Sequence, residues 1–242
     1  MQFLLIIYAA VVAALVIAEL RENRKLQRIF KPLAAFGFCF IAIWVGYFNQ
    51  TFDTFFWKAI LAALIACGIG DVCLLSRDNP TLFKGGMAAF ALGHIIYIFA
   101  ISQLRLATDL ITFVVLTIIG VLVLRWLKPN LPSDMRIPVF AYITIIILMV
   151  WLAVSSASWT LMEVFDVMAL SGSANAKQMS HYLIAPTVLA LAAILFAVSD
   201  MFVARDRFVS PSPKNALIIT PIYFGAQALF AISPALIYPP AL

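Results

Sequence analysis

The sequence predicts an all-α membrane protein, a multi-pass bundle of eight transmembrane helices. Apolar residues make up 64% of the chain and charged residues only 11%, whereas soluble proteins carry about 25% charged residues. The mean hydropathy is +1.06. Apolar runs of about 20 residues, the length that crosses a bilayer core of about 30 Å, recur along the whole chain. We therefore expect one integral membrane domain over residues 1–242, with no separate soluble domain.

The apolar runs divide the chain into its expected helices. The first run has no basic segment before it and no small-residue cleavage site after it, so it is interpreted as a retained span and not as a signal peptide. The connection at 158–180 is longer than the others, and holds either an extension of the sixth helix or a segment lying in the membrane interface. The expected spans are 1–20, 32–49, 55–75, 85–104, 110–127, 137–157, 181–204 and 217–238.

Basic residues are distributed asymmetrically between the two ends of this bundle. Thirteen of the 16 Lys and Arg residues follow odd-numbered spans, and the loops after even-numbered spans hold only Lys58, Arg105 and Lys177. Cytoplasmic loops carry an excess of basic residues. The pattern predicts that the odd loops are cytoplasmic and that both termini lie on the non-cytoplasmic side.

The overall charge and the cysteines exclude other classes of protein. The net charge of +5 comes from residues beside membrane spans, where they set orientation and contact anionic lipid, so we expect membrane lipids as partners and no nucleic acid. Cys39, Cys67 and Cys73 all lie within apolar runs. They predict small buried residues, not a disulfide framework or a metal site.

Four polar groups inside the spans are predicted to lie at similar depth. Asp71 lies about one helical turn before the cytoplasmic end of the third span, and Asp200 has a matching position in the seventh. His94 and Gln227 lie somewhat deeper in the fourth and eighth. Ionisable groups at membrane depth are costly, and so indicate a functional site. The alternative is structural: hydrogen-bonded packing for His94 and Gln227, and pairing of the aspartates with nearby arginines.

Helical spacing adds two tyrosines to this group. Tyr97 shares a face of the fourth helix with His94, and Tyr223 shares a face of the eighth with Gln227. Ordinary packing is the alternative, but a phenol hydroxyl in apolar surroundings needs a hydrogen-bond partner. We expect both tyrosines to support the site.

Several familiar chemistries lack their residues. The sequence has no Gly-x-Ser-x-Gly elbow, no phosphate-binding loop and no dinucleotide fingerprint. His94 and His181 are its only histidines and are expected on opposite sides of the membrane, so no metal site is expected. A carboxylate pair in a low-dielectric pocket is left. Two such groups can hold one proton between them, and a neutral acid beside an ionised partner is the arrangement that cleaves acetal-like bonds.

An ordered set of motifs runs along the chain: Lys31-Pro32-Leu33, Gly68-Ile-Gly70-Asp71-Val-Cys-Leu-Leu75, Phe83-x-x-Gly86-x-x-x-Phe90-x-x-Gly93-His94-x-x-Tyr97, Phe196-Ala-Val-Ser199-Asp200 with Arg207-Phe208, and Tyr223-x-x-Ala226-Gln227. With these motifs the chain resembles the lysoplasmalogenase (YhhN-type) family over nearly its full length. The resemblance implies an eight-helix hydrolase that cleaves the vinyl ether bond of lysoplasmalogens, with Asp71 and Asp200 as catalytic residues. The products would be a fatty aldehyde and glycerophosphoethanolamine or glycerophosphocholine.

On this hypothesis the other residues have secondary roles. His94 and Gln227 would orient a carboxylate or the water, with Tyr97, Ser199 and Tyr223 as supports, and no metal or organic cofactor is needed. Candidates for the substrate phosphate are Lys31, Arg77 and Arg207. The expected location is a bacterial cytoplasmic membrane, with the site toward the cytoplasmic leaflet. The alternatives are a proton-coupled lipid transporter, a non-catalytic lipid-binding protein, and a hydrolase of another lysolipid bond.

Overall fold

The computed structural model describes residues 2–76, 79–107, 109–171 and 176–238. Within these ranges the chain forms helices and no strands, and eight helices are long and apolar enough to cross a membrane. The all-α prediction is confirmed, and the chain is a multi-pass membrane protein. The helices are α1 (Gln2–Leu20), α2 (Arg24–Phe48), α3 (Phe55–Cys73), α4 (Pro80–Ile101), α5 (Leu110–Leu127), α6 (Arg136–Ser171), α7 (Ala176–Phe208) and α8 (Ala216–Ile237), with short 3₁₀ turns η1 (Lys128–Asn130), η2 (Ser133–Met135) and η4 (Pro213–Asn215).

Helices α2, α4 and α7 begin at least five residues earlier than the apolar pattern predicts, and capping residues explain the first two. Helix α2 starts at residue 24 instead of 32, because the Asn23 side chain accepts a hydrogen bond from the Leu26 N–H and caps a charged first turn. Helix α4 starts at residue 80 instead of 85, because Asn79 accepts from the N–H groups of residues 81 and 82, and Pro80 fits the first helical position. Apolar runs therefore mark the membrane core but miss these polar first turns.

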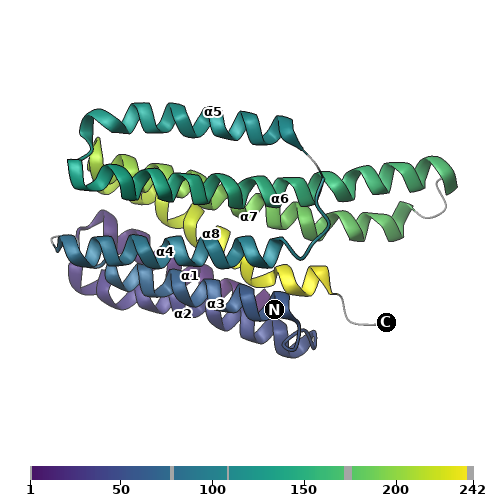
Figure 1. Ribbon diagram of the computed structural model, residues 1–242. Coiled ribbons are helices and arrows are strands. Elements are labelled where there is room, and N and C mark those ends of the chain that lie inside the picture. Colours follow the sequence, from purple (N-terminus) through teal and green to yellow (C-terminus); the bar gives the residue numbers. More distant parts are fainter. Residues whose placement is uncertain (1, 77–78, 108, 172–175, 239–242) are drawn as a thin grey trace.

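The long 158–180 connection is resolved in favour of a helical extension. Helix α6 has 36 residues and continues to Ser171, and α7 has 33 residues and already begins at Ala176. At about 1.5 Å per residue, α6 is about 54 Å long, which exceeds the bilayer core of about 30 Å. Figure 1 shows α6 and α7 projecting together beyond the other helices.

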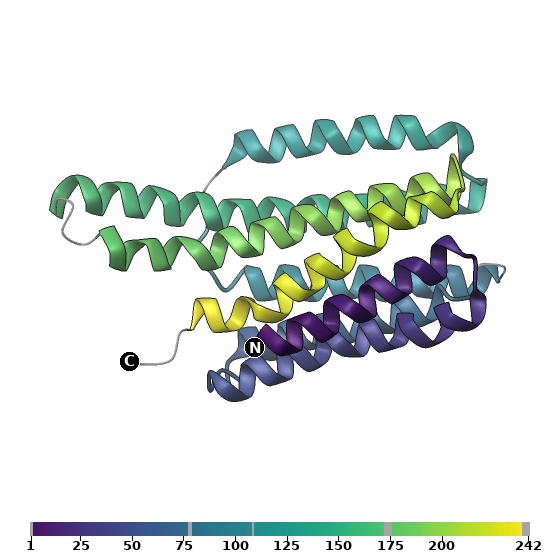
Figure 2. The ribbon, with the colours of Figure 1, turned by 180° about the vertical axis from the view of Figure 1, so that it is seen from behind.

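The helices pack as two groups joined along α8. Helices α1 to α4 lie side by side, α8 crosses between them and α7, and α6 packs on α4 and α7 (Figures 1 and 2). Helix α5 is the outermost helix and packs mainly on α6. The α1–α2, α5–α6 and α7–α8 connections lie at one end of the bundle, and the start of α1 and the end of α8 lie at the other.

Glycines bring α3 and α4 into close contact. A Cβ atom on Gly70 would lie 2.7 Å from the Phe90 ring and 3.1 Å from the Gly86 carbonyl oxygen, and one on Gly93 would lie 2.6 Å from the Cys67 sulfur. Small residues at helix interfaces allow this approach in membrane proteins. Because Asp71 and His94 directly follow these glycines, the close packing also fixes the positions of both side chains.

Candidate active site

A cavity of about 800 Å³ opens at the end of the bundle that carries the α1–α2 and α7–α8 connections. This volume lies within the range of small-molecule sites, about 300–1,000 Å³. The mouth is polar and is lined by residues of α1, α2 and the α7–α8 connection. From there an apolar groove continues between α5, α6 and α7, lined by Leu116, Ile119, Ile146, Val150, Ile194 and Val198.

Asp71 lies in the wall of this cavity and ends a chain of hydrogen bonds. Its side chain is 2% exposed, and its Oδ2 accepts a hydrogen bond of 2.6 Å from the Tyr223 hydroxyl. Gln227 Nε2 donates to the same hydroxyl oxygen at 3.1 Å, and the Tyr97 hydroxyl donates to Gln227 Oε1 at 2.8 Å. The Lys31 ammonium lies 3.6 Å from Asp71 Oδ1. The chain of donors fixes the carboxyl group, and a cation faces it.

Asp200 lines the same cavity with different partners. Its Oδ2 accepts a hydrogen bond of 2.8 Å from the Tyr142 hydroxyl of α6, and His94 Nε2 lies 3.6 Å from the same oxygen. His94 is fully buried, and its Nδ1 lies 2.6 Å from the Phe90 carbonyl oxygen. Because a carbonyl only accepts, Nδ1 carries a proton, and Nε2 is the ring nitrogen that faces Asp200. Nε2 has no hydrogen-bond partner in the part of the chain that is described.

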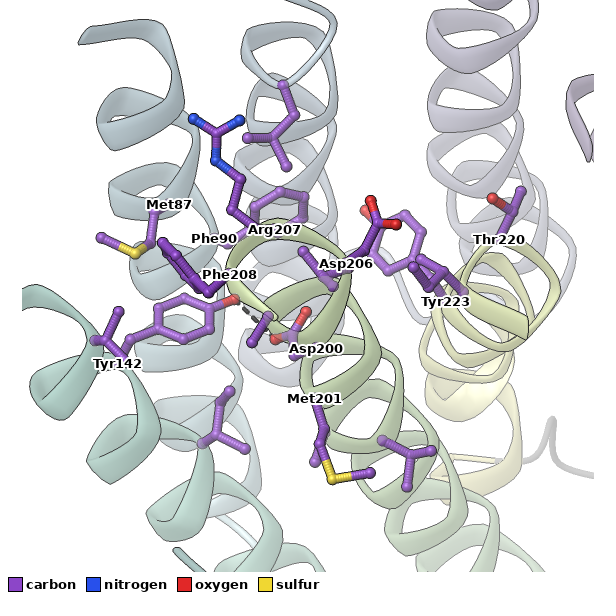
Figure 3. Close-up of a pocket in the computed structure, with 18 of the residues that line it drawn as sticks. Met87, Phe90, Tyr142, Asp200, Met201, Asp206, Arg207, Phe208, Thr220 and Tyr223 are labelled. Carbon is purple, nitrogen blue, oxygen red and sulfur yellow. Dashed lines mark hydrogen bonds between the residues drawn. The ribbon is translucent and has the colours of Figure 1, made fainter. Parts of the chain in front are cut away.

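Aromatic rings connect the two carboxyl groups. Phe196 packs edge-on against His94 at 4.4 Å and against Tyr223 at 5.3 Å, measured between ring centroids. Asp71 and Asp200 are close enough for their charges to interact. In the view of Figure 3, Asp200 lies between Tyr142 and Tyr223. The arrangement is a carboxyl pair at the junction of a polar mouth and an apolar groove.

The sequence matches the model of the YhhN family over residues 26–234. The chain belongs to the YhhN family. It is 31% identical over 178 residues to lysoplasmalogenase TMEM86B of Homo sapiens and 30% identical over 181 residues to lysoplasmalogenase TMEM86A of Bos taurus. These matches cover 73% and 72% of this chain but only 63% and 64% of the two relatives. No solved structure matches the sequence.

Most of the residues singled out in this YhhN chain come together. Asp71, Asp200, His94, Tyr97, Tyr223 and Gln227 form the two networks described above. The Ser199 hydroxyl is buried and donates to the Phe196 carbonyl of its own helix, so the structure does not bring it to either carboxylate. Lys31 pairs with Asp71. Arg207 lines the mouth and stacks over the Phe83 ring at 4.4 Å. Arg77 lies outside the described residues.

Three residues of this site were missed in the sequence. Tyr142 lies a few residues into the sixth span, so the depth count that found Asp71 could also have found it. Glu19, near the end of α1, accepts a hydrogen bond from Thr220 and lines the mouth, but it was given no role because it lies at the end of the first expected span, next to the basic loop. Phe196 belongs to a motif that carries the family resemblance, but its role was missed because a phenylalanine in an apolar span normally predicts only packing.

Proposed function

We propose that this chain is a lysoplasmalogenase-like hydrolase that cleaves the vinyl ether bond of a single-chain phospholipid. The observation that carries the proposal is the carboxyl pair, buried where a polar mouth meets an apolar groove. The names of the two relatives support it. Such a pocket matches a ligand with one apolar chain, a bond to be cleaved near its polar end, and a charged headgroup.

The reaction requires acid catalysis at carbon. A carboxylic acid delivers a proton to the β-carbon of the vinyl ether, and the α-carbon becomes an oxocarbenium ion stabilised by a nearby carboxylate. Water adds to the α-carbon and loses a proton to the enzyme. The hemiacetal then collapses to a fatty aldehyde and the free hydroxyl of glycerophosphoethanolamine or glycerophosphocholine. One water is consumed and no redox change occurs.

The neighbours of the two carboxyl groups assign their roles within this proposal. Asp71 faces the Lys31 ammonium and the Tyr223 hydroxyl, two partners that favour a carboxylate, so Asp71 is the ionised group that stabilises the cation. Asp200 faces an imidazole nitrogen that can accept a hydrogen bond from a protonated carboxyl group, so Asp200 is the acid. His94 holds the Asp200 hydroxyl in place, and Tyr97 and Gln227 hold Tyr223 against Asp71.

The substrate lies across the pocket on this view. Its tail occupies the groove between α5, α6 and α7, and its phosphate lies at the mouth near Lys31 and Arg207. Arg77 is kept as a third phosphate candidate from the sequence. Because the mouth opens at the end with the basic loops, we propose that the site faces the cytoplasmic leaflet of a bacterial cytoplasmic membrane.

The test is aldehyde release by the purified protein in detergent. Wild type is expected to release aldehyde from lysoplasmenylethanolamine and not from the matching acyl lysophospholipid. Asp71→Asn and Asp200→Asn are each expected to abolish release while leaving a monodisperse, folded protein. Asp53→Asn is the control, because Asp53 is exposed and pairs with Lys58.

Two results would contradict this proposal. Near-normal turnover in either pocket variant would refute the two-carboxylate mechanism. No aldehyde from wild type, together with lipid movement that requires sealed vesicles, would favour a transporter instead.

A further inference from the structure

We propose that Glu19 binds the positively charged amine of the substrate headgroup and so makes the enzyme selective for zwitterionic lipids. The inference rests on the proposed function, since it concerns a ligand of the same pocket. Glu19 lies in the last turn of α1, lines the mouth of the cavity, and is only 9% exposed. It takes no part in the mechanism assigned to Asp71 and Asp200.

Among the described residues, the hydrogen-bond partner of the Glu19 carboxylate is a neutral hydroxyl. Glu19 Oε2 accepts a hydrogen bond from the Thr220 hydroxyl of α8, and the Lys31 ammonium of the same cavity lies 3.6 Å from Asp71 Oδ1. A carboxylate this deeply buried is costly unless a charge or several donors compensate it. The adjacent space is the cavity itself, so a cation carried by the ligand can supply the compensation.

The charges of the mouth also favour a zwitterion. The described lining of the cavity contains five carboxyl side chains, namely Glu19, Glu22, Asp71, Asp200 and Asp206, against the three basic side chains of Arg24, Lys31 and Arg207. A ligand with only a phosphate would add negative charge to a lining that already has more acids than bases. A ligand with a phosphate and an ammonium group presents one charge to each kind of side chain.

Hydrogen bonds hold Glu19 at the mouth. The turn between α1 and α2 is fixed by Asn23, which caps α2, and by Gln27, whose side-chain Nε2 donates to the Ala18 carbonyl oxygen at 3.2 Å. Thr220 holds the carboxylate from the opposite side. The Glu19 side chain is therefore directed by its surroundings, and the oxygen not bound to Thr220 is available to a ligand.

The location also agrees with the length of the substrate. Glu19 and Thr220 belong to α1 and α8, whereas the apolar groove is formed by α5, α6 and α7. In the view of Figure 3, Asp200 lies between Tyr142 and Tyr223, and Thr220 lies beyond Tyr223 on the side away from Tyr142. Glu19 is close enough to Asp71 for their charges to interact. The amine, the vinyl ether and the tail would thus follow one another across the pocket.

The experiment uses pairs of lipids that differ only in the headgroup amine. The full chain in a neutral detergent is titrated with a saturated 1-O-alkyl lysophosphoethanolamine, which cannot be cleaved, and with its N-acetyl derivative, which lacks the positive charge. Wild type is expected to bind the lipid with the free amine about tenfold more tightly than its N-acetyl derivative. This difference is the scale of one hydrogen bond to a charged group. Glu19→Gln is expected to bind both lipids within about twofold of each other.

The control variant is Glu163→Gln, because Glu163 is exposed on the extension of α6 and pairs with Arg105. It should keep the full preference for the amine. The readout is the ratio of the dissociation constants of the two lipids, measured on one protein preparation. A partly unfolded sample therefore changes both apparent affinities equally and leaves the ratio unchanged. A preference kept by Glu19→Gln, or absent from wild type, would overturn the inference.

Turnover of the corresponding vinyl ether pair separates this inference from the proposed function. If wild type binds the free-amine lipid selectively but releases no aldehyde, the proposed headgroup site is supported and the proposed hydrolase activity is refuted. If wild type cleaves both lipids with equal efficiency, the proposed hydrolase activity is supported and the proposed headgroup site is refuted. An equal loss of turnover on both lipids in Glu19→Gln would assign Glu19 to the reaction instead of the headgroup, and would also refute the inference.

Discussion

Replacing Gly70 with alanine should disturb both the packing of the bundle and the geometry at Asp71. The new Cβ would lie 2.7 Å from two carbons of the Phe90 ring, whereas carbon atoms prefer separations of about 3.5–4.0 Å. The ring must therefore move by about 1 Å. The Gly86 carbonyl oxygen, 3.1 Å from the new Cβ, belongs to the backbone of α4 and cannot rotate away. We expect α3 and α4 to separate.

The expected cost follows from these distances. Overpacking costs about 1–3 kcal/mol, of which the higher helix propensity of alanine recovers about 0.5–1 kcal/mol. A net loss of about 1–2 kcal/mol lowers the melting temperature of a chain of this size by about 2–8 °C. Tyr223 packs edge-on against Phe90 at 5.8 Å, so a shift of the ring also lengthens the 2.6 Å hydrogen bond to Asp71. Misplacement by about 1 Å can reduce turnover about 100-fold.

Gly85→Ala provides the matched control for Gly70→Ala. Gly85 lies in α4, the helix that packs against Gly70, but it is exposed, and a Cβ there would meet no atom within 4 Å. The melting temperature of the Gly85→Ala variant should equal or exceed that of wild type, and its turnover should not change. Thermal unfolding in detergent and aldehyde release measure the two effects. Equal melting temperatures and equal turnover in the two variants would refute the argument that this close contact positions the site.

Three further predictions concern single side chains. Tyr142→Phe removes the hydroxyl that donates to Asp200 and should lower kcat about 10- to 100-fold in a protein that still melts normally; unchanged kcat would contradict this. Trp57→Phe removes a 2.8 Å hydrogen bond to a carbonyl of α2 and should cost about 1 kcal/mol of stability without changing kcat, as thermal melts would show. Asp109 accepts hydrogen bonds from the hydroxyl and the N–H of Thr112, which hold its pKa below the ordinary value of 3.8. Its stabilisation is therefore complete above about pH 4 and lost as the pH falls through the lowered pKa. Asp109→Asn should flatten this acid decline in the melting temperature, and an unchanged decline would refute the assignment.

The sequence could predict the depth of polar groups but not their partners. Counting residues from the basic loops placed Asp71, Asp200, His94 and Gln227 at one level, and the structure brings them into two adjoining networks. Depth follows from the fixed rise of a helix. The rotation of each helix about its axis is a different quantity. In spans that are apolar on every side, this rotation depends on packing between helices, so neither the contact of Tyr142 with Asp200 nor the pairing of Lys31 with Asp71 could be predicted.

The helix ends show a second limit of sequence patterns. Charged residues from Arg24 to Lys31 were interpreted as a loop, yet they form the first turns of α2 because Asn23 caps it. The sequence also offered no reason to single out Glu19, since a lone acid at the end of a span, next to a basic loop, is usually solvated. Its burial arises from contact with α8, about 200 residues further along the chain.

The separation of the pocket walls has a consequence for how such proteins diversify. The groove is built by α5, α6 and α7, whereas the polar mouth is built mainly by α1, α2 and α8. Substitutions that shorten or widen the space for a hydrocarbon chain thus fall in one continuous stretch of sequence, and those that alter the charge of the mouth fall elsewhere. The preferences for chain length and for headgroup can therefore change independently. Exchanging residues 110–200 between two homologues should transfer the chain-length preference and not the headgroup preference.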